Sequence, residues 1–228
     1  RQMKYLSLFS GIGGFELGIN QAYEQLCNAH RGQNGGIKEN TTGNQGQGFQ
    51  STERQNVSSE ERSTGERTPD EPYERPLCVG FSEIDKYATQ IYQHHFPTHH
   101  NYGDITKINP EELPDFDLLC GGFPCQSFSI AGKRGGFRDS RGTLFFEIAR
   151  IIKEKQPRLL FLENVKGLLS HDQGNTFGTI INTLDELGYD LQWQVLNSKN
   201  HGVPQNRERV FIVGHLRGTP RPQVFPFA

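Results

Sequence analysis

Short apolar segments alternate with amphipathic segments along most of the chain, and few folds can accommodate that order. The apolar segments have the length of buried strands, and the segments between them repeat apolar residues at helical spacing. The predicted strands are residues 4–9, 77–82, 116–120, 159–163, 190–197 and 210–214, and the predicted helices are residues 15–26, 84–95, 143–155 and 176–187. This order predicts an α/β fold with a doubly wound, mostly parallel sheet that binds ligands outside the carboxyl ends of its strands.

One polar segment, residues 28–76, interrupts this pattern. It is rich in Gly, Asn, Gln, Ser, Thr and Glu and has almost no apolar residues. Such a segment cannot bury enough surface to offset the entropy that is lost when a chain becomes ordered. We therefore expect a disordered surface insertion within a single catalytic domain that covers residues 3–218.

The composition excludes several classes of protein. Hydrophobic residues make up 33% of the 228 residues, which is enough for one domain with a core. No run of about 18 apolar residues occurs, so we expect a soluble, cytoplasmic protein rather than a membrane protein. The 4 cysteines form no CxxC pair, which argues against a disulfide framework or a zinc site. The formal net charge of -2 does not by itself indicate a nucleic-acid-binding protein.

The first predicted strand leads into a glycine-rich turn, Phe9-Ser10-Gly11-Ile12-Gly13-Gly14. Glycines at the start of a helix let a ligand approach the backbone, although a plain tight turn or a dinucleotide dehydrogenase would have a similar sequence. Glu83 ends the second strand, where such folds bind ribose hydroxyls. Asp104, which is predicted to lie at the next strand end, could accept a hydrogen bond from an adenine amino group, although a lone acid is more often a helix cap or a turn residue. Together these residues predict a cofactor that contains adenosine.

A cysteine, Cys125, follows the third predicted strand in the segment Gly121-Gly122-Phe123-Pro124-Cys125-Gln126-Ser127. A lone cysteine is more often a small buried hydrophobic residue than a nucleophile. Here the preceding Gly-Phe-Pro and the following polar residues favour an exposed loop. Because a free thiol has a pKa of about 8.5, a nucleophilic Cys125 would need a helix N-terminus or nearby positive charge to stabilise its thiolate.

Four motifs, in this order along the chain, resemble those of the cytosine C5 DNA methyltransferase family. They are the cofactor motif of residues 9–14, the nucleophile motif Pro124-Cys125-Gln126, the acid motif Glu163-Asn164-Val165 and the paired-arginine motif of residues 205–209. The resemblance runs from residue 4 to about residue 218. It implies the Rossmann-like fold of the S-adenosylmethionine-dependent methyltransferases.

The resemblance implies a role for each motif in the methylation of cytosine. Cys125 would attack C6, and Glu163 would protonate or hydrogen-bond N3 as charge develops there. Arg209, and with it Arg207, would donate to the cytosine O2 and orient the other two groups. S-adenosyl-L-methionine would supply the methyl group, and the implied cofactor-binding residues are Phe9, Ser10, Gly11, Gly13, Gly14, Glu83, Ile84, Asp104, Ile105, Pro124 and Leu144.

The implied partner is double-stranded DNA, because the family acts on a cytosine that has been flipped out of the duplex. Residues 127–137 have the composition of a mobile loop that closes over the DNA backbone. The implied DNA-binding residues are Gln126, Ser127, Lys133 and Arg134, although the two basic residues would equally suit an ordinary solvated loop. The family also implies a bacterial or phage origin, in a restriction-modification or phage modification system.

Members of the family continue into a target-recognition domain and then return to the catalytic domain. Residues 219–228 resemble the start of the link toward that domain. We therefore expect the chain to be a fragment, or one half of an enzyme whose second polypeptide supplies the rest.

Three other functions remain open from the sequence. The chain could be an RNA cytosine methyltransferase with the same chemistry, or a cofactor-binding half that is inactive without a partner. An NAD-dependent dehydrogenase rests on the fold alone and leaves the Pro-Cys-Gln loop unexplained. We do not expect the histidines at positions 94, 95, 99 and 100 to bind a metal, since the predicted chemistry needs none. Trp193, Phe145 and Phe146 are predicted to belong to the core.

Overall fold

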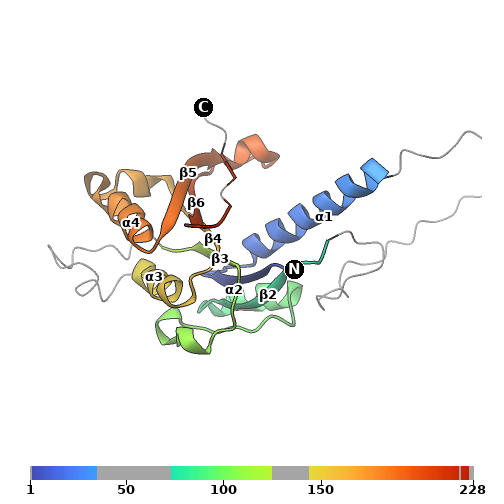
Figure 1. The fold of residues 1–228 in the computed structure, drawn as a ribbon, viewed down its shortest axis with the longest axis horizontal. Coiled ribbons are helices and arrows are strands. Elements are labelled where there is room, and N and C mark those ends of the chain that lie inside the picture. The colour runs from blue at the N-terminus through green and yellow to red at the C-terminus, as the bar shows by residue number, and fades with distance from the viewer. Residues whose placement is uncertain (1, 35–72, 125–143, 221, 226–228) are drawn as a thin grey trace, which may run out of the picture.

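The computed structural model describes residues 2–34, 73–124, 144–220 and 222–225. Figure 1 shows this part as strands of one sheet with helices packed against it. The strands and α-helices are, in order, β1 (Lys4–Leu8), α1 (Gly14–Asn34), β2 (Leu77–Ser82), α2 (Lys86–His95), β3 (Leu118–Gly122), α3 (Leu144–Lys155), β4 (Leu159–Val165), α4 (Asn175–Glu186), β5 (Tyr189–Asn197) and β6 (Glu208–Leu216). Short 3₁₀ turns lie between several of these elements.

The described residues form a sheet of six strands in the order β2-β1-β3-β4-β6-β5. Strands β2, β1, β3 and β4 pair in parallel, whereas β6 is antiparallel to both of its neighbours. The chain leaves β1 toward β2 and later returns to β3 on the other side of β1. The crevice between β1 and β3 is therefore the switch point of a doubly wound sheet, where ligands bind in such folds. This arrangement confirms the predicted α/β fold.

The central strands are buried on both faces, which explains why they are almost continuously apolar. Leu6 and Leu8 of β1, and Leu160 and Leu162 of β4, are at most 1% exposed. On one face α1 and α2 cover the sheet, and the ring of Phe15 packs edge-on against Phe161. Helices α3 and α4 pack on the other face, where their apolar side chains join the main core.

Helix α1 continues to Asn34 and so extends into the segment that was predicted to be a polar insertion. The far end of that segment is also part of the fold. The Tyr23 hydroxyl donates to the carbonyl of Tyr73 over 3.0 Å, and the Arg75 guanidinium lies 4.8 Å from the centre of the Tyr23 ring. The predicted boundaries, 28 and 76, were therefore wrong at both ends. Residues 35–72, to which the prediction of disorder also applies, lie outside the described residues.

Three further expectations differ from the structure. Trp193 was predicted to lie in the core, but it is 49% exposed because β5 is an edge strand, and it packs edge-on against Phe177. Helix α2 begins at Lys86 instead of residue 84, because the Asp85 side chain accepts from the amide of Ala88 and caps the helix. The predicted strand end before Asp104 is a single parallel bridge between Phe81 and Asn101.

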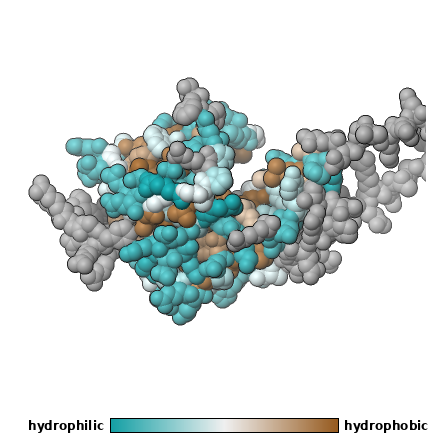
Figure 2. Space-filling model, viewed as in Figure 1, coloured by the Kyte–Doolittle hydropathy of each residue, from teal (hydrophilic) through white to brown (hydrophobic). Residues whose placement is uncertain are grey.

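The surface in Figure 2 is mostly hydrophilic, with apolar side chains visible in small patches between the polar ones. No helix within the described ranges has both the length and the apolar character that crossing a membrane requires.

Candidate active site

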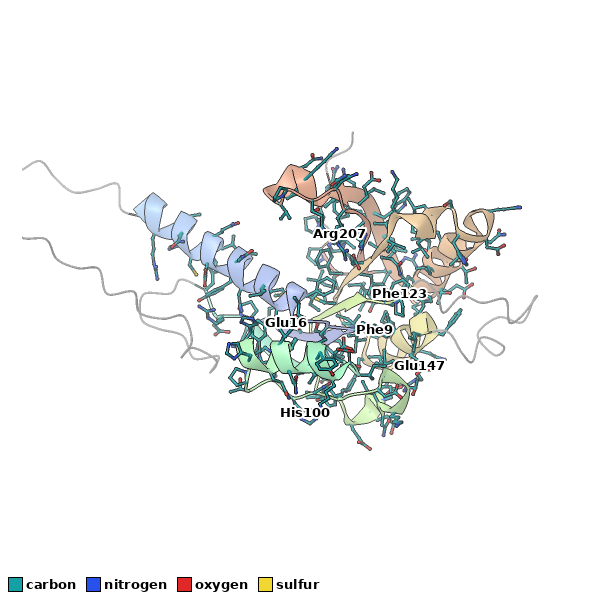
Figure 3. The ribbon with its side chains drawn as sticks, turned by 180° about the vertical axis from the view of Figure 1, so that it is seen from behind. Phe9, Glu16, His100, Phe123, Glu147 and Arg207 are labelled. Carbon is teal, nitrogen blue, oxygen red and sulfur yellow. The ribbon has the colours of Figure 1, made fainter. Side chains whose placement is uncertain are left out.

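The loops that follow the parallel strands, together with the beginning of β6, meet at one edge of the sheet. Figure 3 shows Phe9 and Phe123, which follow the paired strands β1 and β3, near the middle of the molecule, with Arg207 above them in this view and His100 below. The predicted site residues that the structure describes belong to this edge.

The glycine-rich turn after β1 has a backbone that favours glycine. Gly11 and Gly13 have positive φ angles of 55° and 93°, and Phe9 also has a positive φ of 54°. A Cβ atom at Gly13 would lie 2.8 Å from the ring of Phe96, so a side chain would not fit there. A Cβ atom at Gly11 would meet no described atom within 4 Å. The buried Ser10 hydroxyl donates to the Ser7 carbonyl and fixes the turn against β1. The turn is thus fixed against β1 on one side, while no described atom lies close to the Cβ position of Gly11 on the other.

Glu83, at the end of β2, connects this turn to α2. One carboxylate oxygen, Oε2, accepts from the amide of Gly11 over 2.8 Å. The other oxygen, Oε1, accepts from the amides of Ile84 and Asp85 over 2.9 and 2.8 Å. A carboxylate has about four acceptor positions, so Oε2 keeps capacity for a ligand hydroxyl.

Asp104 follows the short bridge that Asn101 makes with β2. Its carboxylate is also held in one orientation. Oδ1 accepts from the amide and the hydroxyl of Thr106 over 3.0 and 2.8 Å. These hydrogen bonds lower the pKa of Asp104, so the group is ionised at neutral pH. Among the described residues neither bond uses Oδ2, which leaves that oxygen for a donor such as an amino group. The next side chain, Ile105, is buried in the core.

Two large apolar side chains near these acids in the chain are exposed. Ile84, directly after Glu83, is 77% exposed, and Ile12, in the glycine-rich turn, is 55% exposed. Leu144, at the start of α3, is partly buried against the core, and Pro124 is exposed. These features fit an adenosine-containing cofactor. One acid could bind hydroxyls and the other an amino group, while the apolar surface could cover a ring and the glycine turn leaves room for the ligand.

The acid at the end of β4, Glu163, forms an ion pair with Arg209 at the start of β6. The Nε of Arg209 lies 2.8 Å from Oε1 of Glu163, and both side chains are about four-fifths buried, with 20% and 23% exposed. Burial raises the pKa of Glu163, while the charges of Arg209 and Arg207 oppose that rise. Arg207 is exposed and acts on Glu163 only through its charge. The site therefore contains an acid with an increased tendency to hold a proton, oriented by a guanidinium group.

Asn164 and Gly122 join the Glu163 strand to the loop that leads toward Cys125. The buried Asn164 side chain donates to the carbonyl of Phe123 over 2.8 Å and so ties the start of the loop to β4. Gly122 pairs with Glu163 across the sheet, and a Cβ atom there would lie 3.2 Å from Oε2 of Glu163. The sequence alone assigns no separate role to Gly122, because this close cross-strand neighbour is seen only in the folded chain.

Some predicted site residues lie outside the described residues. They are Cys125, Gln126, Ser127, Lys133 and Arg134, and Pro124 is the last described residue before them. The ranges that are described contain no group of three or more His, Cys, Asp or Glu side chains that could hold a metal ion. Of the clustered histidines, His99 stacks on Phe96, and burial lowers its pKa to about 4.

The doubly wound sheet with one antiparallel strand, together with the switch-point loop, defines the class as the Rossmann-like fold of S-adenosylmethionine-dependent methyltransferases. Solved structures agree with this class. A putative DNA modification methyltransferase encoded within an E. coli prophage matches with a TM-score of 0.59 and 21% identity, covering 95% of this chain and 47% of that one. The S. pombe Dnmt2 methyltransferase matches with a TM-score of 0.59 and 16% identity, covering 98% of this chain and 52% of that one. These similarities show the fold.

The chain belongs to the C-5 cytosine-specific DNA methylase family, whose model matches residues 74–226. It is 39% identical over 227 residues to the type II methyltransferase M.NgoBV of Neisseria gonorrhoeae, which covers 96% of this chain and 43% of that protein. It is 52% identical over 136 residues to the type II methyltransferase M.HhaI of Haemophilus parahaemolyticus, covering 60% of this chain and 41% of that protein. The orphan methyltransferase M.SPRI of Bacillus phage SPR is 54% identical over 138 residues, covering 60% of this chain and 31% of that protein. The chain thus spans about two fifths of the length of the first two relatives, 43% and 41%.

Proposed function

We propose that this chain is the catalytic and cofactor-binding part of an enzyme that methylates C5 of cytosine in DNA, within a restriction-modification or phage modification system. The Glu163–Arg209 pair carries the proposal, because it lies at the same edge of the sheet as the loop that leads to Cys125. Family membership and the names of the relatives, type II and orphan methyltransferases, support the same substrate class.

S-adenosyl-L-methionine supplies the methyl group when it is bound. The glycine turn of residues 9–14 would face its charged part, where the start of α1 offers backbone amides. Oε2 of Glu83 would accept from the ribose hydroxyls, and Oδ2 of Asp104 would accept from the adenine amino group. Ile84 would cover the ring. The hydrogen bonds of the described residues leave acceptor capacity on both carboxylates, and Ile84 is exposed.

Cytosine C5 is too weak a nucleophile to take a methyl group directly, so the ring must first be activated. The Cys125 thiolate forms a bond to C6, and the electron pair of the C5–C6 double bond moves through the ring toward N3. Glu163 donates a proton to N3, which leaves an enamine whose C5 is nucleophilic. After methylation, a water molecule takes the C5 proton, the C6–sulfur bond breaks, and N3 returns its proton to Glu163. These steps restore the aromatic ring, the thiolate and the carboxylic acid.

The surroundings of Glu163 suit this proton transfer. Burial raises its pKa, so the carboxyl group holds a proton nearer to neutral pH than an exposed glutamate does. The Arg209 guanidinium fixes the orientation of Oε1 and is available to donate to the cytosine O2. The Asn164 hydrogen bond to Phe123 holds the start of the Cys125 loop against the same strand.

The substrate base must leave the duplex, because C6 of a stacked cytosine cannot be reached by a side chain. Base flipping costs a few kcal/mol, which contacts to the flipped base and the DNA backbone offset. Gln126, Ser127, Lys133 and Arg134 are proposed to make such contacts. A second polypeptide, or a further part of the same protein, would supply the recognition of a specific sequence.

DNA that contains 5-fluorocytosine tests the proposal, because fluorine blocks the loss of the C5 substituent and traps the cysteine adduct. In the presence of S-adenosyl-L-methionine, we expect a covalent complex that survives denaturing electrophoresis. Cys125→Ser should give no complex, while Cys78→Ser should still form it, since Cys78 hydrogen-bonds the Gly80 carbonyl within the fold. Duplex DNA and transfer RNA are compared as substrates, and adducts on RNA alone would favour an RNA methyltransferase. If no adduct forms, either with this chain or with a chimera that carries the C-terminal part of M.HhaI, the proposed mechanism is wrong.

A further inference from the structure

The side chain of Asn101 connects the two acids of the proposed cofactor site. Its Oδ1 accepts from the amide of Glu83 over 3.2 Å and from the amide of Gly103 over 2.8 Å. Its Nδ2 donates to the carbonyl of Glu83 over 3.0 Å. One side chain thus makes three hydrogen bonds, two to the backbone of Glu83 and one to the residue directly before Asp104.

An asparagine is chemically required for this pattern. Its amide offers a carbonyl oxygen that accepts twice and an NH₂ group that donates, all in one plane. An aspartate in its place would face the Glu83 carbonyl with an oxygen that cannot donate, and it would add negative charge between two carboxylates. An alanine would leave the amides of Glu83 and Gly103 without this partner.

The Asp104 segment depends on such side-chain contacts, because it contains little regular structure. It pairs with β2 through the single bridge between Phe81 and Asn101, and the turn that follows, Ile105–Lys107, is one short 3₁₀ helix. The Arg150 guanidinium holds the far side of this turn by donating to the carbonyls of Ile105 and Ile108 over 3.1 and 2.8 Å. The near side is held by Asn101 and by the Ser82 hydroxyl, which donates to the Gly103 carbonyl.

We propose that Asn101 is a positioning residue that fixes the separation of Glu83 and Asp104 and so lets the two carboxylates bind the ribose and the adenine of one cofactor molecule together. This inference rests on the proposed function. Through the hydrogen bond between Glu83 and the amide of Gly11, the same side chain also couples the Asp104 segment to the glycine-rich turn. Asn101 acts through these neighbours and not by contact with the reacting atoms.

The first test uses the ligand-free chain and measures hydrogen exchange of individual amides. In Asn101→Ala, the amides of Glu83 and Gly103 should exchange faster, while amides in the middle of β4 keep their protection. The matched control is Asn109→Ala, which removes a similar asparagine contact to the amide of Glu111 in the next 3₁₀ turn. That control should speed exchange at Glu111 only. Unchanged exchange at Glu83 and Gly103 in Asn101→Ala would contradict the hydrogen-bond pattern itself.

The second test measures binding by calorimetry with two ligands, S-adenosyl-L-homocysteine and S-inosyl-L-homocysteine, in which a carbonyl replaces the adenine amino group. For Asn101→Ala we expect affinity for the adenosyl ligand to fall about tenfold, which corresponds to the loss of roughly one well-placed hydrogen bond. Affinity for the inosyl ligand should fall less, by about threefold, because Asp104 has no amino group to bind there. Asn109→Ala should bind both ligands as the unmodified chain does.

The outcomes separate this inference from the proposed function. Equal losses for both ligands, or no loss for either, overturn the positioning role while the cofactor site stands. If the unmodified chain binds the two ligands equally well, Asp104 does not read the amino group, and the inference fails in the same way. If the unmodified chain binds neither ligand, the proposed cofactor site is wrong and the inference fails with it.

Discussion

The Glu16 carboxyl group is fully buried in the first turn of α1, directly below the glycine-rich turn. Its Oε1 accepts from the Tyr92 hydroxyl over 2.9 Å, and that hydroxyl also lies 2.9 Å from Nδ1 of His99. Burial raises the pKa of Glu16 because the charged form would lose its hydration. An acid was not expected at this position, since helix periodicity assigns buried positions to apolar residues.

The raised pKa of Glu16 predicts a pH dependence that Glu16→Gln should remove. The protonated carboxyl favours the folded state below about pH 4.3, the pKa of an unfolded glutamate, and this contribution is lost as the pH rises through the folded-state pKa. Glutamine stays neutral, so the variant should become more stable than the unmodified chain as pH increases, by about 1.4 kcal/mol for each tenfold change in the ionisation constant. Urea unfolding from pH 4 to pH 8 measures the difference, and parallel profiles for both proteins would contradict it.

At the scale of elements, α1 and residues 73–76 hold the two ends of the segment that lies between them. Tyr23 contacts both Tyr73 and Arg75, and the ring of His30 packs edge-on against Tyr73. Through these contacts, the residues on the two sides of the segment pack against each other within the fold. On one side they belong to helix α1, which is described to Asn34.

Replacement of residues 35–72 by a short Gly-Ser linker should therefore leave the free energy of unfolding nearly unchanged. Removal of residues 28–76 should cost about 1–3 kcal/mol more, because it deletes a hydrogen bond and a cation–π contact along with the last turns of α1. Thermal and urea unfolding of the two variants measure this difference. Equal destabilisation by both deletions would show that residues 35–72 themselves support the fold.

The sequence predicted the order of the elements well, but not all of their ends. Gly121 and Gly122 belong to β3 although glycine weakens strands, because pairing with Leu162 and Glu163 outweighs their propensity. Helix α1 continues past Leu26, where Cys27 is buried and the ring of His30 packs edge-on against Tyr73. Tertiary contacts determine where β3 and α1 end, and the local sequence pattern carries no information about those contacts.

The residues of the site also divide into those that a local sequence pattern predicts and those that depend on tertiary contacts. Glu83, Asp104 and Glu163 were predicted because acids at strand ends and motif resemblance identify them without knowledge of contacts. Asn101 was not, because its three hydrogen bonds join segments that meet only through the bridge to Phe81. Arg209 was predicted as a partner of Glu163, and the structure describes the ion pair, whereas its catalytic role stays a prediction.

For the whole molecule, the proposed cofactor site predicts stabilisation by ligand. S-adenosyl-L-homocysteine at a hundred times its Kd should add about 2.7 kcal/mol to the stability, which corresponds to a rise of about 5 to 10 °C in Tm for a domain of this size. Cys125→Ser should keep the full rise, because the nucleophile is not part of the cofactor site. Asp104→Asn should reduce it. Thermal unfolding at several ligand concentrations measures the effect, and a Tm that does not depend on ligand would contradict the site.

The antiparallel direction of β6 has a consequence for how the site is completed. A parallel strand brings its last residues to the catalytic edge, whereas β6 brings its first ones, so Arg209 enters beside Val165 and within reach of Glu163. Strand β6 also takes the place between β4 and the earlier strand β5. A growing chain that ends at β5 thus has Glu163 but not Arg209, and the ion pair forms only when the last strand of the sheet inserts between β4 and β5.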